Sequence, residues 1–315
     1  MYKFIYFNDL HLRGDNPENR VDSYCLSVFD KLEQILALAD GRKCNAIVTC
    51  GDFWDTPLVS NTLSDKALDL IEGIGIPLYS CFGNHDELNH EVRLSKATSL
   101  AHMFRRSKVF KRLETLKIND ISIVGIDYEH NIESRLETLL RERSEGLEPS
   151  KPKIGIVHAL VTPDKFRPDV LHCNAKTLQH DYDLLLTGHY HQPFVVNNII
   201  NVGCIGRTEI TEMSIRPSVL LVTCDTKVTY EKIELKCKPG EEVFDLKKLE
   251  LSKAFDSNLD NFINNLSTTE VRGLKFRDLV QLNAPGAGVN QEVIDEIITR
   301  IGRYENELHR RIETY

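Results

Sequence analysis

Five short clusters of polar residues follow apolar, strand-like runs in this sequence. They combine carboxylate, carboxamide and imidazole side chains, a mixture that suits Mn²⁺, Fe or Zn²⁺ better than Ca²⁺ or a metal that prefers thiolates. We therefore expect a metal centre built from several segments of the chain. The clusters are Asp9-Leu10-His11, Gly51-Asp52-Phe53-Trp54-Asp55, Gly83-Asn84-His85-Asp86, the single residue His158, and Gly188-His189-Tyr190-His191.

The spacing within the clusters allows two side chains to reach one ion. At the end of an extended strand, alternate residues leave the chain on the same side, as the polar members of D-x-H and H-x-H do. Glycines precede Asp52, Asn84 and His189, and we expect them to let the backbone turn sharply without a side chain that blocks the metal pocket. A lone D-x-H or a lone histidine is more often a surface or satisfied core residue. Five clusters in this order, each at a strand end, outweigh that interpretation.

The elements that must position these clusters alternate through the first two thirds of the chain. Short apolar runs alternate with amphipathic stretches of helical period, which predicts a layered α/β fold. In such folds, ligands bind beyond the carboxyl ends of the strands. The predicted strands are 3–8, 46–50, 77–82, 121–126, 153–158 and 184–187, and the predicted helices are 21–39, 60–71, 94–104 and 132–140.

The last third of the chain has a different pattern. Three β-rich runs without an intervening helix, 194–202, 218–224 and 227–235, suit hairpins that close the sheet. The polar segment Lys236–Glu242 indicates a linker. Beyond it, helical stripes around Phe255–Leu266 and Ile294–Leu308 flank a strand-like run. We therefore predict a first domain over residues 1–236 and a small α+β domain over residues 243–315.

Composition excludes several classes of protein. The chain has 315 residues, a net charge of −8 and 27% charged residues, which is ordinary for a globular protein. No apolar run approaches the roughly 20 residues that span a bilayer, so we expect no membrane association. Because acidic residues outnumber basic residues, any binding of nucleic acid must use a local patch rather than the whole surface. None of the eight cysteines forms a C-x-x-C pair, which predicts free thiols and a cytoplasmic protein.

The series D-x-H, G-D-x-x-D, G-N-H-D, H and G-H-x-H resembles the calcineurin-like metallophosphoesterase superfamily. The resemblance covers about residues 1–235, and every expected motif position is filled. It implies a two-sheet α/β sandwich with two divalent metal ions at the strand ends. Carried over residue by residue, it implies a bridging role for Asp52 between two sets of ligands, which are Asp9, His11 and His191 for one ion and Asn84, His158 and His189 for the other.

The same resemblance implies a catalytic role for His85. In the family this histidine faces the scissile phosphate and gives a proton to the leaving oxygen. It needs a partner that holds its tautomer and raises its pKa. We expect Asp55 to be that partner, with Asp86 as the second candidate.

Among members of the superfamily, the chain is most similar to the SbcD-type DNA repair nucleases. The order of the elements, the spacing of Asp9, Asp52 and Asn84, and the small domain after a linker carry this similarity. It implies DNA as substrate, a capping domain that positions it, and an SbcC-like ATPase as partner. It also implies a homodimer through helices near residues 60–72 and 93–104. The ligand types favour Mn²⁺ as the ion.

The leading hypothesis is a DNA exonuclease with single-strand endonuclease activity. A phosphatase or a cyclic-nucleotide or small phosphodiesterase on the same scaffold is the second enzyme hypothesis. A non-catalytic scaffold is the third, although such proteins usually lose ligands. Two secondary features stay open. The basic run Arg105–Arg112 is a solvated face or a phosphate contact, and Trp54 packs in the core or stacks on a base.

Overall fold

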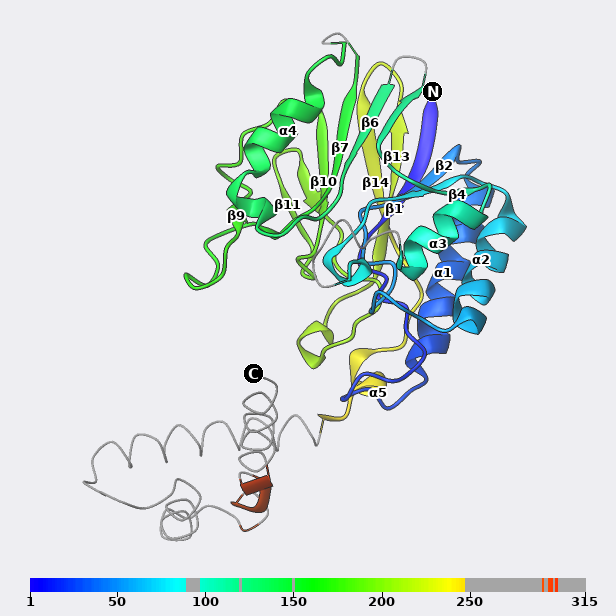
Figure 1. Ribbon diagram of the computed structural model, residues 1–315, viewed down its shortest axis with the longest axis vertical. Coiled ribbons are helices and arrows are strands. Elements are labelled where there is room, and N and C mark those ends of the chain that lie inside the picture. The colour runs from blue at the N-terminus through cyan, green and yellow to red at the C-terminus, as the bar shows by residue number, and fades with distance from the viewer. Residues whose placement is uncertain are drawn as a thin grey trace, which may run out of the picture. The chain divides into compact units, whose positions relative to one another are not determined.

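The computed structural model describes residues 1–88, 97–118, 121–148 and 151–246, together with residues 291, 294–296, 298 and 299. Contacts along the chain divide it into two compact units, Met1–Phe244 and Asp245–Tyr315. In the first unit, two six-stranded sheets stack face to face and helices cover their outer faces (Figure 1). This is the predicted α/β metallophosphoesterase sandwich.

The first sheet carries three of the five polar clusters. Its strands β1 to β4 run parallel, and a hairpin of β13 and β14 extends it antiparallel beside β1. In spatial order the strands are β14 (Val228–Glu234), β13 (Ser218–Cys224), β1 (Tyr2–Phe7), β2 (Ala46–Thr49), β3 (Leu78–Ser80) and β4 (Phe110–Arg112).

The second sheet carries the other two clusters. Its four central strands are parallel, and β11 and β5 pair antiparallel at its two edges. The spatial order is β11 (Phe194–Val196), β12 (Ile199–Asn201), β10 (Leu184–Gly188), β7 (Lys153–His158), β6 (Ile121–Ile126) and β5 (Thr115–Ile118). A separate parallel pair consists of β8 (Val161–Thr162) and β9 (Cys173–Asn174).

Alternating side chains of the strands build the core on both faces of each sheet. In β1, Phe4 and Tyr6 point into the cluster between the sheets, whereas Ile5 and Phe7 point into the cluster under the helices. This is the two-residue period of an extended chain. Both faces of β1 are therefore buried, which anchors the loop that follows Phe7.

Four helices cover the outer faces of the sheets. Figure 1 shows α1 (Tyr24–Gly41), α2 (Asn61–Ile74) and α3 (Ser99–Arg106) on the first sheet, and α4 (Leu136–Ser144) on the second. The start of α2 is capped by Ser60, whose hydroxyl accepts from the backbone N–H of Leu63. Its end is formed by Gly75 in the left-handed conformation, with φ 69°.

The structure differs from the sequence predictions in several connections. The predicted hairpins fall in different sheets, because the short 3₁₀ helix η4 (Ile210–Glu212) separates them. The basic run 105–112 includes the edge strand β4, in which Arg112 contacts Asp127. Trp54 is fully buried, so core packing is the correct alternative.

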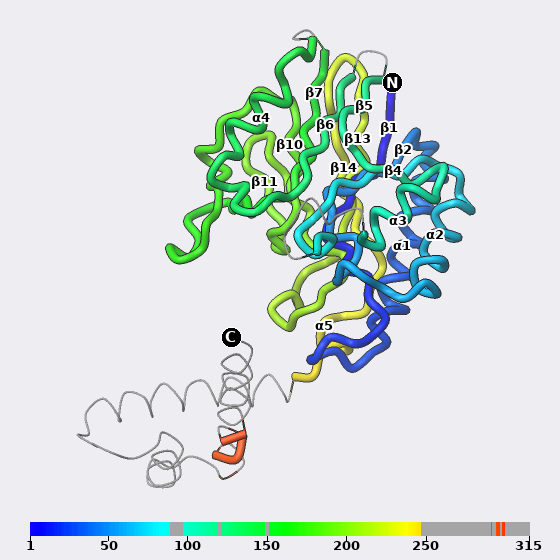
Figure 2. Tube along the Cα trace, viewed as in Figure 1, coloured from blue at the N-terminus to red at the C-terminus, as the bar shows by residue number. Residues whose placement is uncertain are grey.

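The segment predicted as a linker belongs to the first unit and packs against its early loop. It contains the short helix α5 (Gly240–Val243), and Val243 and Phe244 are buried. The backbone N–H of Val21 donates to the carbonyl of Val243, and Arg20 lies over the ring of Phe244. Figure 2 shows α5 beside the early loop of the chain. Three sequence predictions lie outside the described residues: the strand-like run at 274–282, the helical stripe at 255–266, and the part of the second stripe beyond residue 299.

Two further predictions concern cysteines and membranes. All eight cysteines are free, and Cys50, Cys81, Cys204 and Cys224 are buried, as small apolar residues are. Among the helices of the described residues, none is both long and apolar enough to cross a membrane.

Candidate metal centre

The five polar clusters meet because each follows the carboxyl end of a strand. Asp9 and His11 follow β1, Asp52 follows β2, and Asn84 begins the 3₁₀ helix η1 (Asn84–Asp86) after β3. On the second sheet, His158 ends β7, and His189 and His191 follow β10. The parallel strands of each sheet place these ends at one edge. The backbone N–H of His11 donates to the carbonyl of Asp52, which ties two clusters together.

Four of the seven predicted ligands have an unusual backbone conformation. Their φ angles are positive, at 49° for Asp9, 48° for His11, 47° for Asp52 and 78° for His189. Residues other than glycine seldom adopt this region, and where they do the surrounding structure must hold them there. Such residues concentrate at functional sites. The turns after β1, β2 and β10 are therefore shaped for the side chains that they present.

The glycines before the predicted ligands serve two different purposes. Gly51 has φ 123°, so it makes the sharp turn that the sequence predicts. Gly83 has an ordinary φ of −97°, but a Cβ there would lie 2.1 Å from Oδ1 of Asp52. A Cβ on Gly188 would lie 2.0 Å from Sγ of Cys50. At these two positions close approach, rather than a turn, requires glycine.

One group of potential ligands consists of Asp9, His11 and His191, whose ligand atoms lie within 4.8 Å of one another. Nε2 of His11 lies 3.0 Å from Nε2 of His191. The opposite ring nitrogens are both engaged, because Nδ1 of His11 contacts a carboxylate oxygen of Asp55 at 3.1 Å and Nδ1 of His191 contacts Glu212. With the protons on Nδ1, two Nε2 lone pairs face each other, as ligands of a shared cation do.

A second group consists of Asp52, His158 and His189, which also lie within 4.8 Å of one another. Asn84 joins them through its amide oxygen, 2.9 Å from Nε2 of His158. His158 is fully buried, whereas Asn84 and His189 are half-buried. The two groups thus contain the two sets of residues that the family resemblance implies.

Asp52 lies between the two groups. Its Oδ1 accepts from the backbone N–H of His85 at 2.9 Å. Its Oδ2 is buried and has no hydrogen-bond partner within the described part of the chain. That atom lies 3.6 Å from Nε2 of His11 and 3.3 Å from Nε2 of His158. A buried carboxylate oxygen left open between two imidazoles is the arrangement that a bridging ligand requires.

The charges at this edge fit cations. Asp9 and Asp52 are buried, and in the described residues their ion-pair contacts are with histidines and not with lysine or arginine. Buried carboxylates are costly unless they are paired or bind a metal. The residues present therefore fit the divalent ions that the resemblance implies, with oxygen and imidazole donors of the kind that Mn²⁺, Fe and Zn²⁺ accept.

In the metal-free chain the pKa values of these histidines differ because their neighbours differ. Burial opposes the charge of His158, but Asp52 outweighs it and raises the pKa of His158 to about 9. Burial likewise opposes charge on His191, but its hydrogen bond to Glu212 raises the pKa of His191 to about 9. Burial and the positive charge of His158 lower the pKa of His189 to about 4. The pKa of Asp52 is well below its usual range, because His158 outweighs the effect of burial.

His85 lies at the rim of the centre, and it contacts the predicted partner Asp55 through the backbone of that residue rather than through its carboxylate. Nδ1 of His85 donates to the backbone carbonyl of Asp55 at 2.8 Å, which leaves Nε2 for another group. The Asp55 carboxylate instead contacts His11 and Arg13. The carboxylate of Asp86 accepts from the backbone N–H groups of Trp54 and Gly83. The tautomer of His85 is therefore set by a carbonyl, and Asp55 acts on it through its backbone.

His85 is also close enough to be considered as a ligand. Its ring lies 4.7 Å from that of His11, and His85, His11 and Asp52 form a third group of potential ligands. Metal binding and proton transfer by His85 are thus separate hypotheses that need separate tests.

Glu212 is the residue of this site that sequence reasoning missed. It belongs to η4, is 3% exposed on its side chain, and contacts Nδ1 of His191. Its other oxygen accepts from the backbone N–H of Glu209 at 3.0 Å. A carboxylate behind a metal-binding histidine orients the ring and raises its basicity. The two residues are 21 positions apart, and no local pattern links them.

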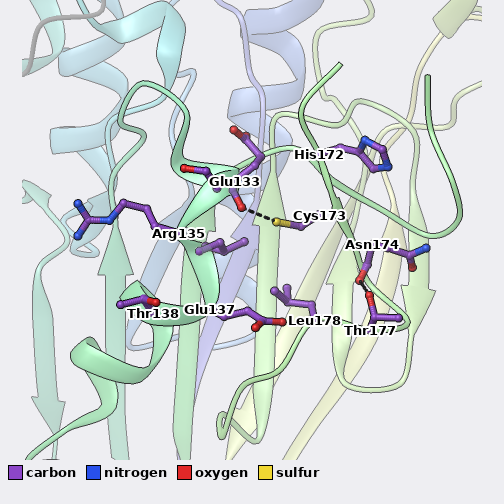
Figure 3. Close-up of a pocket in the computed structure, with 11 residues that line it drawn as sticks. Glu133, Arg135, Glu137, Thr138, His172, Cys173, Asn174, Thr177 and Leu178 are labelled. Atoms are coloured by element: carbon purple, nitrogen blue, oxygen red, sulfur yellow. Dashed lines mark hydrogen bonds between the residues drawn. The ribbon is translucent and has the colours of Figure 1, made fainter. Parts of the chain in front are cut away.

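A separate cavity of about 320 Å³ lies between the start of α4 and β9 (Figure 3). Figure 3 shows the contact of Cys173 Sγ with the backbone carbonyl of Glu133, at 3.3 Å. Side-chain oxygens of Glu133 and Glu137 accept from the backbone N–H groups of Leu160 and Gln179. None of the predicted ligands lines this cavity, so it is distinct from the metal centre.

The two-sheet sandwich and the convergent carboxylate, amide and imidazole groups define a metal-dependent phosphoesterase. A family model described as calcineurin-like phosphoesterase matches residues 2–193. The chain belongs to this family, whose members bind two divalent metal ions. Such ions lower the pKa of a bound water and stabilise charge on the reacting phosphate.

Solved structures similar to this chain include three with informative descriptions. A dimetal phosphatase from Danio rerio is 10% identical, with a TM-score of 0.45 over 75% of this chain and 99% of that chain. A protein of Thermus thermophilus is 12% identical, with a TM-score of 0.42 over 73% and 98%. A metallophosphoesterase from Sphaerobacter thermophilus is 15% identical, with a TM-score of 0.35 over 74% and 89%. Among curated proteins, none matches the chain.

Proposed function

We propose that this phosphoesterase is an SbcD-like nuclease, which hydrolyses DNA as an exonuclease with single-strand endonuclease activity in repair or recombination. The observation that carries the proposal is the position of His85 at the rim of the ligand groups, with Nδ1 held by a carbonyl and Nε2 left for substrate. The sugar hydroxyl that leaves a DNA phosphodiester is a poor leaving group, and a positioned acid accelerates its departure.

In this proposal Asp9, His11 and His191 hold one ion, Asn84, His158 and His189 hold the other, and Asp52 bridges them. Mn²⁺ is the proposed ion, because imidazole and amide ligands favour it over Mg²⁺, which prefers oxygen ligands and water. The partial exposure of Asn84, His189 and His191 supports access of a large substrate to the centre.

Incubation of metal-stripped protein with single- and double-stranded DNA tests the proposal. Each substrate is offered with Mn²⁺, Mg²⁺ or Zn²⁺, beside bis-para-nitrophenyl phosphate. We expect DNA cleavage with Mn²⁺ and little with Mg²⁺ alone. Cleavage of the small diester, of phosphomonoesters or of cyclic nucleotides without DNA cleavage would support the small-substrate alternative. Full DNA cleavage with rigorously purified Mg²⁺ would contradict the ligand assignment.

Replacement of His85 by Gln separates proton transfer from metal binding. His85→Gln should retain two ions per chain by elemental analysis, yet cleave DNA roughly 10²–10⁴-fold more slowly, the usual contribution of a general acid. The deficit should shrink on a diester with a para-nitrophenolate leaving group. Loss of an ion in this variant would make His85 a ligand. Equal impairment on good and poor leaving groups would give it a role in positioning the phosphate.

The second compact unit, Asp245–Tyr315, is proposed to position DNA rather than to take part in the chemistry. A chain ending at Leu246 keeps the buried residues Val243 and Phe244. It should cleave the small diester normally and lose most DNA cleavage, whereas a chain ending at Lys236 should also lose thermal stability. An equal loss of both activities in the longer truncated chain, with its fold intact, would place the second unit in the active site.

The proposal extends to two partners. An SbcC-like ATPase would feed DNA to the nuclease, and a homodimer would form through α2 and α3. Sedimentation analysis of the purified chain tests the dimer. A monomer at all concentrations would contradict it.

A further inference from the structure

A small cavity of about 150 Å³ is lined in part by Tyr128, whose ring lies near those of His158 and His189. Its lining comes from the residues on either side of η1, from the end of β6 and the residues that follow it, from α4, and from Arg112 of β4. Apolar surface comes from Phe82, Ile126, Leu139 and the ring of Tyr128. The charged residues of the lining are Glu87, Arg112, Asp127, Glu129 and Arg143. The cavity and the metal centre therefore share the segment that leads out of β3.

Tyr128 connects the cavity to the metal centre directly. Its ring lies 6.1 Å from that of His158 and 5.9 Å from that of His189, measured between centroids. Its backbone N–H donates to the carbonyl of Phe82 at 2.9 Å. Glu87 is three residues beyond Asn84 and directly follows η1, with extended backbone. A group bound in the cavity would thus lie next to a phosphate at the ions.

Glu87 is the unusual member of the lining. It is 4% exposed, and its Oε2 has no hydrogen-bond partner within the described residues. Asp127, in contrast, is satisfied, because it accepts from the backbone N–H of Phe82 at 2.7 Å and from Arg112. A buried acceptor without a partner is costly, and a ligand with a donor group would remove that cost.

The size and the lining select the chemistry of the ligand. Pockets for drug-sized ligands measure roughly 300–1,000 Å³, so this cavity accommodates one ring system rather than a whole nucleotide. Apolar and aromatic side chains suit the faces of a planar ring. A carboxyl oxygen suits an exocyclic amino group on its edge, such as N4 of cytosine. Thymine has an acceptor oxygen at the equivalent position.

We propose that this cavity binds the nucleobase adjacent to the scissile phosphate, and that the Glu87 carboxyl accepts a hydrogen bond from its exocyclic amino group. The inference rests on the proposed nuclease function, since it assigns a base subsite to the same centre. It predicts a preference for cytosine over thymine at the nucleotide that occupies the cavity.

Competition by mononucleotides tests the subsite without requiring DNA cleavage. Hydrolysis of bis-para-nitrophenyl phosphate by the full chain with Mn²⁺ is measured with dCMP, dTMP or N4,N4-dimethyl-dCMP as inhibitor. In the wild-type protein we expect dCMP to inhibit at a concentration roughly fivefold or more below that of dTMP. The dimethyl analogue has lost both donors and should inhibit no better than dTMP. Equal inhibition by dCMP and dTMP would overturn the proposal without any variant.

Two variants then assign the preference to Glu87. Glu87→Gln should reduce the dCMP preference to within about twofold, because an amide can donate to thymine O4 as well as accept from cytosine. Glu129→Gln is the matched control, since Glu129 lines the same cavity but is paired with Arg135 at 3.3 Å. It should retain the full preference. An unchanged preference in folded Glu87→Gln, or an equal loss in Glu129→Gln, would contradict the assignment.

DNA cleavage by the wild-type protein reports separately on the proposed function. If the wild-type protein discriminates dCMP from dTMP but cleaves no DNA, the base subsite is supported and the nuclease assignment is wrong. If it cleaves DNA but does not discriminate the two nucleotides, the nuclease assignment is supported and the base subsite is wrong.

Discussion

The two groups of potential ligands differ in what lies behind their histidines. In the group of Asp9, His11 and His191, both imidazoles have Nδ1 against a carboxylate, from Asp55 and Glu212. In the other group, Nδ1 of His158 lies 3.9 Å from Sγ of Cys50 and 3.9 Å from Asp9. The backbone N–H of His189 donates to Asp9, but within the described residues its imidazole has no hydrogen bond to a carboxylate and lies against the ring of Tyr128.

This difference predicts unequal affinities for two ions. A carboxylate behind a ligating histidine fixes the orientation of the ring and raises its basicity. The Cys50 thiol, 3.9 Å from His158, and the Tyr128 ring beside His189 orient these imidazoles less firmly and raise their basicity less. We therefore expect the ion held by Asp9, His11 and His191 to bind more tightly than the ion held by Asn84, His158 and His189. Asp52 belongs to both groups and should affect both ions.

Asp52→Asn should have the largest effect, because it removes the charge that lies between the groups. We expect both ions to bind at least roughly 100-fold more weakly and hydrolysis of the small diester to fall to background. Elemental analysis after gel filtration measures the ions, and circular dichroism of the metal-free protein controls for the fold. Two tightly bound ions in Asp52→Asn would refute its bridging role.

Glu212→Gln should weaken only the tighter site. Loss of the carboxylate behind His191 should reduce affinity for that ion by roughly 10–100-fold, with little change at the other site. The matched control is Glu209→Gln, on the same loop, where the exposed side chain contacts Thr211 instead of a predicted ligand. Calorimetric titration with Mn²⁺ distinguishes them. Equal weakening of both sites, or an equally large effect in Glu209→Gln, would contradict the claim that Glu212 strengthens only the site that contains His191.

Cys50→Ala should have the smallest effect. The thiol is a weak hydrogen-bonding group and lies 3.9 Å from His158, so we expect less than about a threefold change in affinity for the weaker ion. The same titration measures it, with unfolding temperature as a check because Cys50 is buried against Gly188. A tenfold or greater loss of that ion in a folded variant would show that Cys50 positions His158.

The positions of the strands can be predicted from the sequence more accurately than the contacts around the site can. The predicted strands 121–126, 153–158 and 218–224 coincide with β6, β7 and β13, because continuous apolar runs between polar segments indicate buried strands. The edge strand β4 was not predicted, since only Phe110 of its three residues is buried. An edge strand this short carries no readable period.

The same limit applies to the candidate site. The residues predicted as ligands converge because each follows a strand, and strand ends are visible in the sequence. Their binding of ions stays a prediction. The contact of Glu212 with His191 and the use of the Asp55 carbonyl by His85 depend on how loops fold over the strand ends. Tertiary contacts of this kind leave no spacing pattern in one sequence.

Titration of the metal-free full chain with Mn²⁺ in a calorimeter tests the central claim most directly. The two groups share Asp52, but only one of them has carboxylates in contact with Nδ1 of its histidines. We therefore expect two ions per chain, the first bound at least about tenfold more tightly than the second. A single ion per chain would contradict the two-ion centre, and two ions of equal affinity would contradict the asymmetry that Asp55 and Glu212 impose.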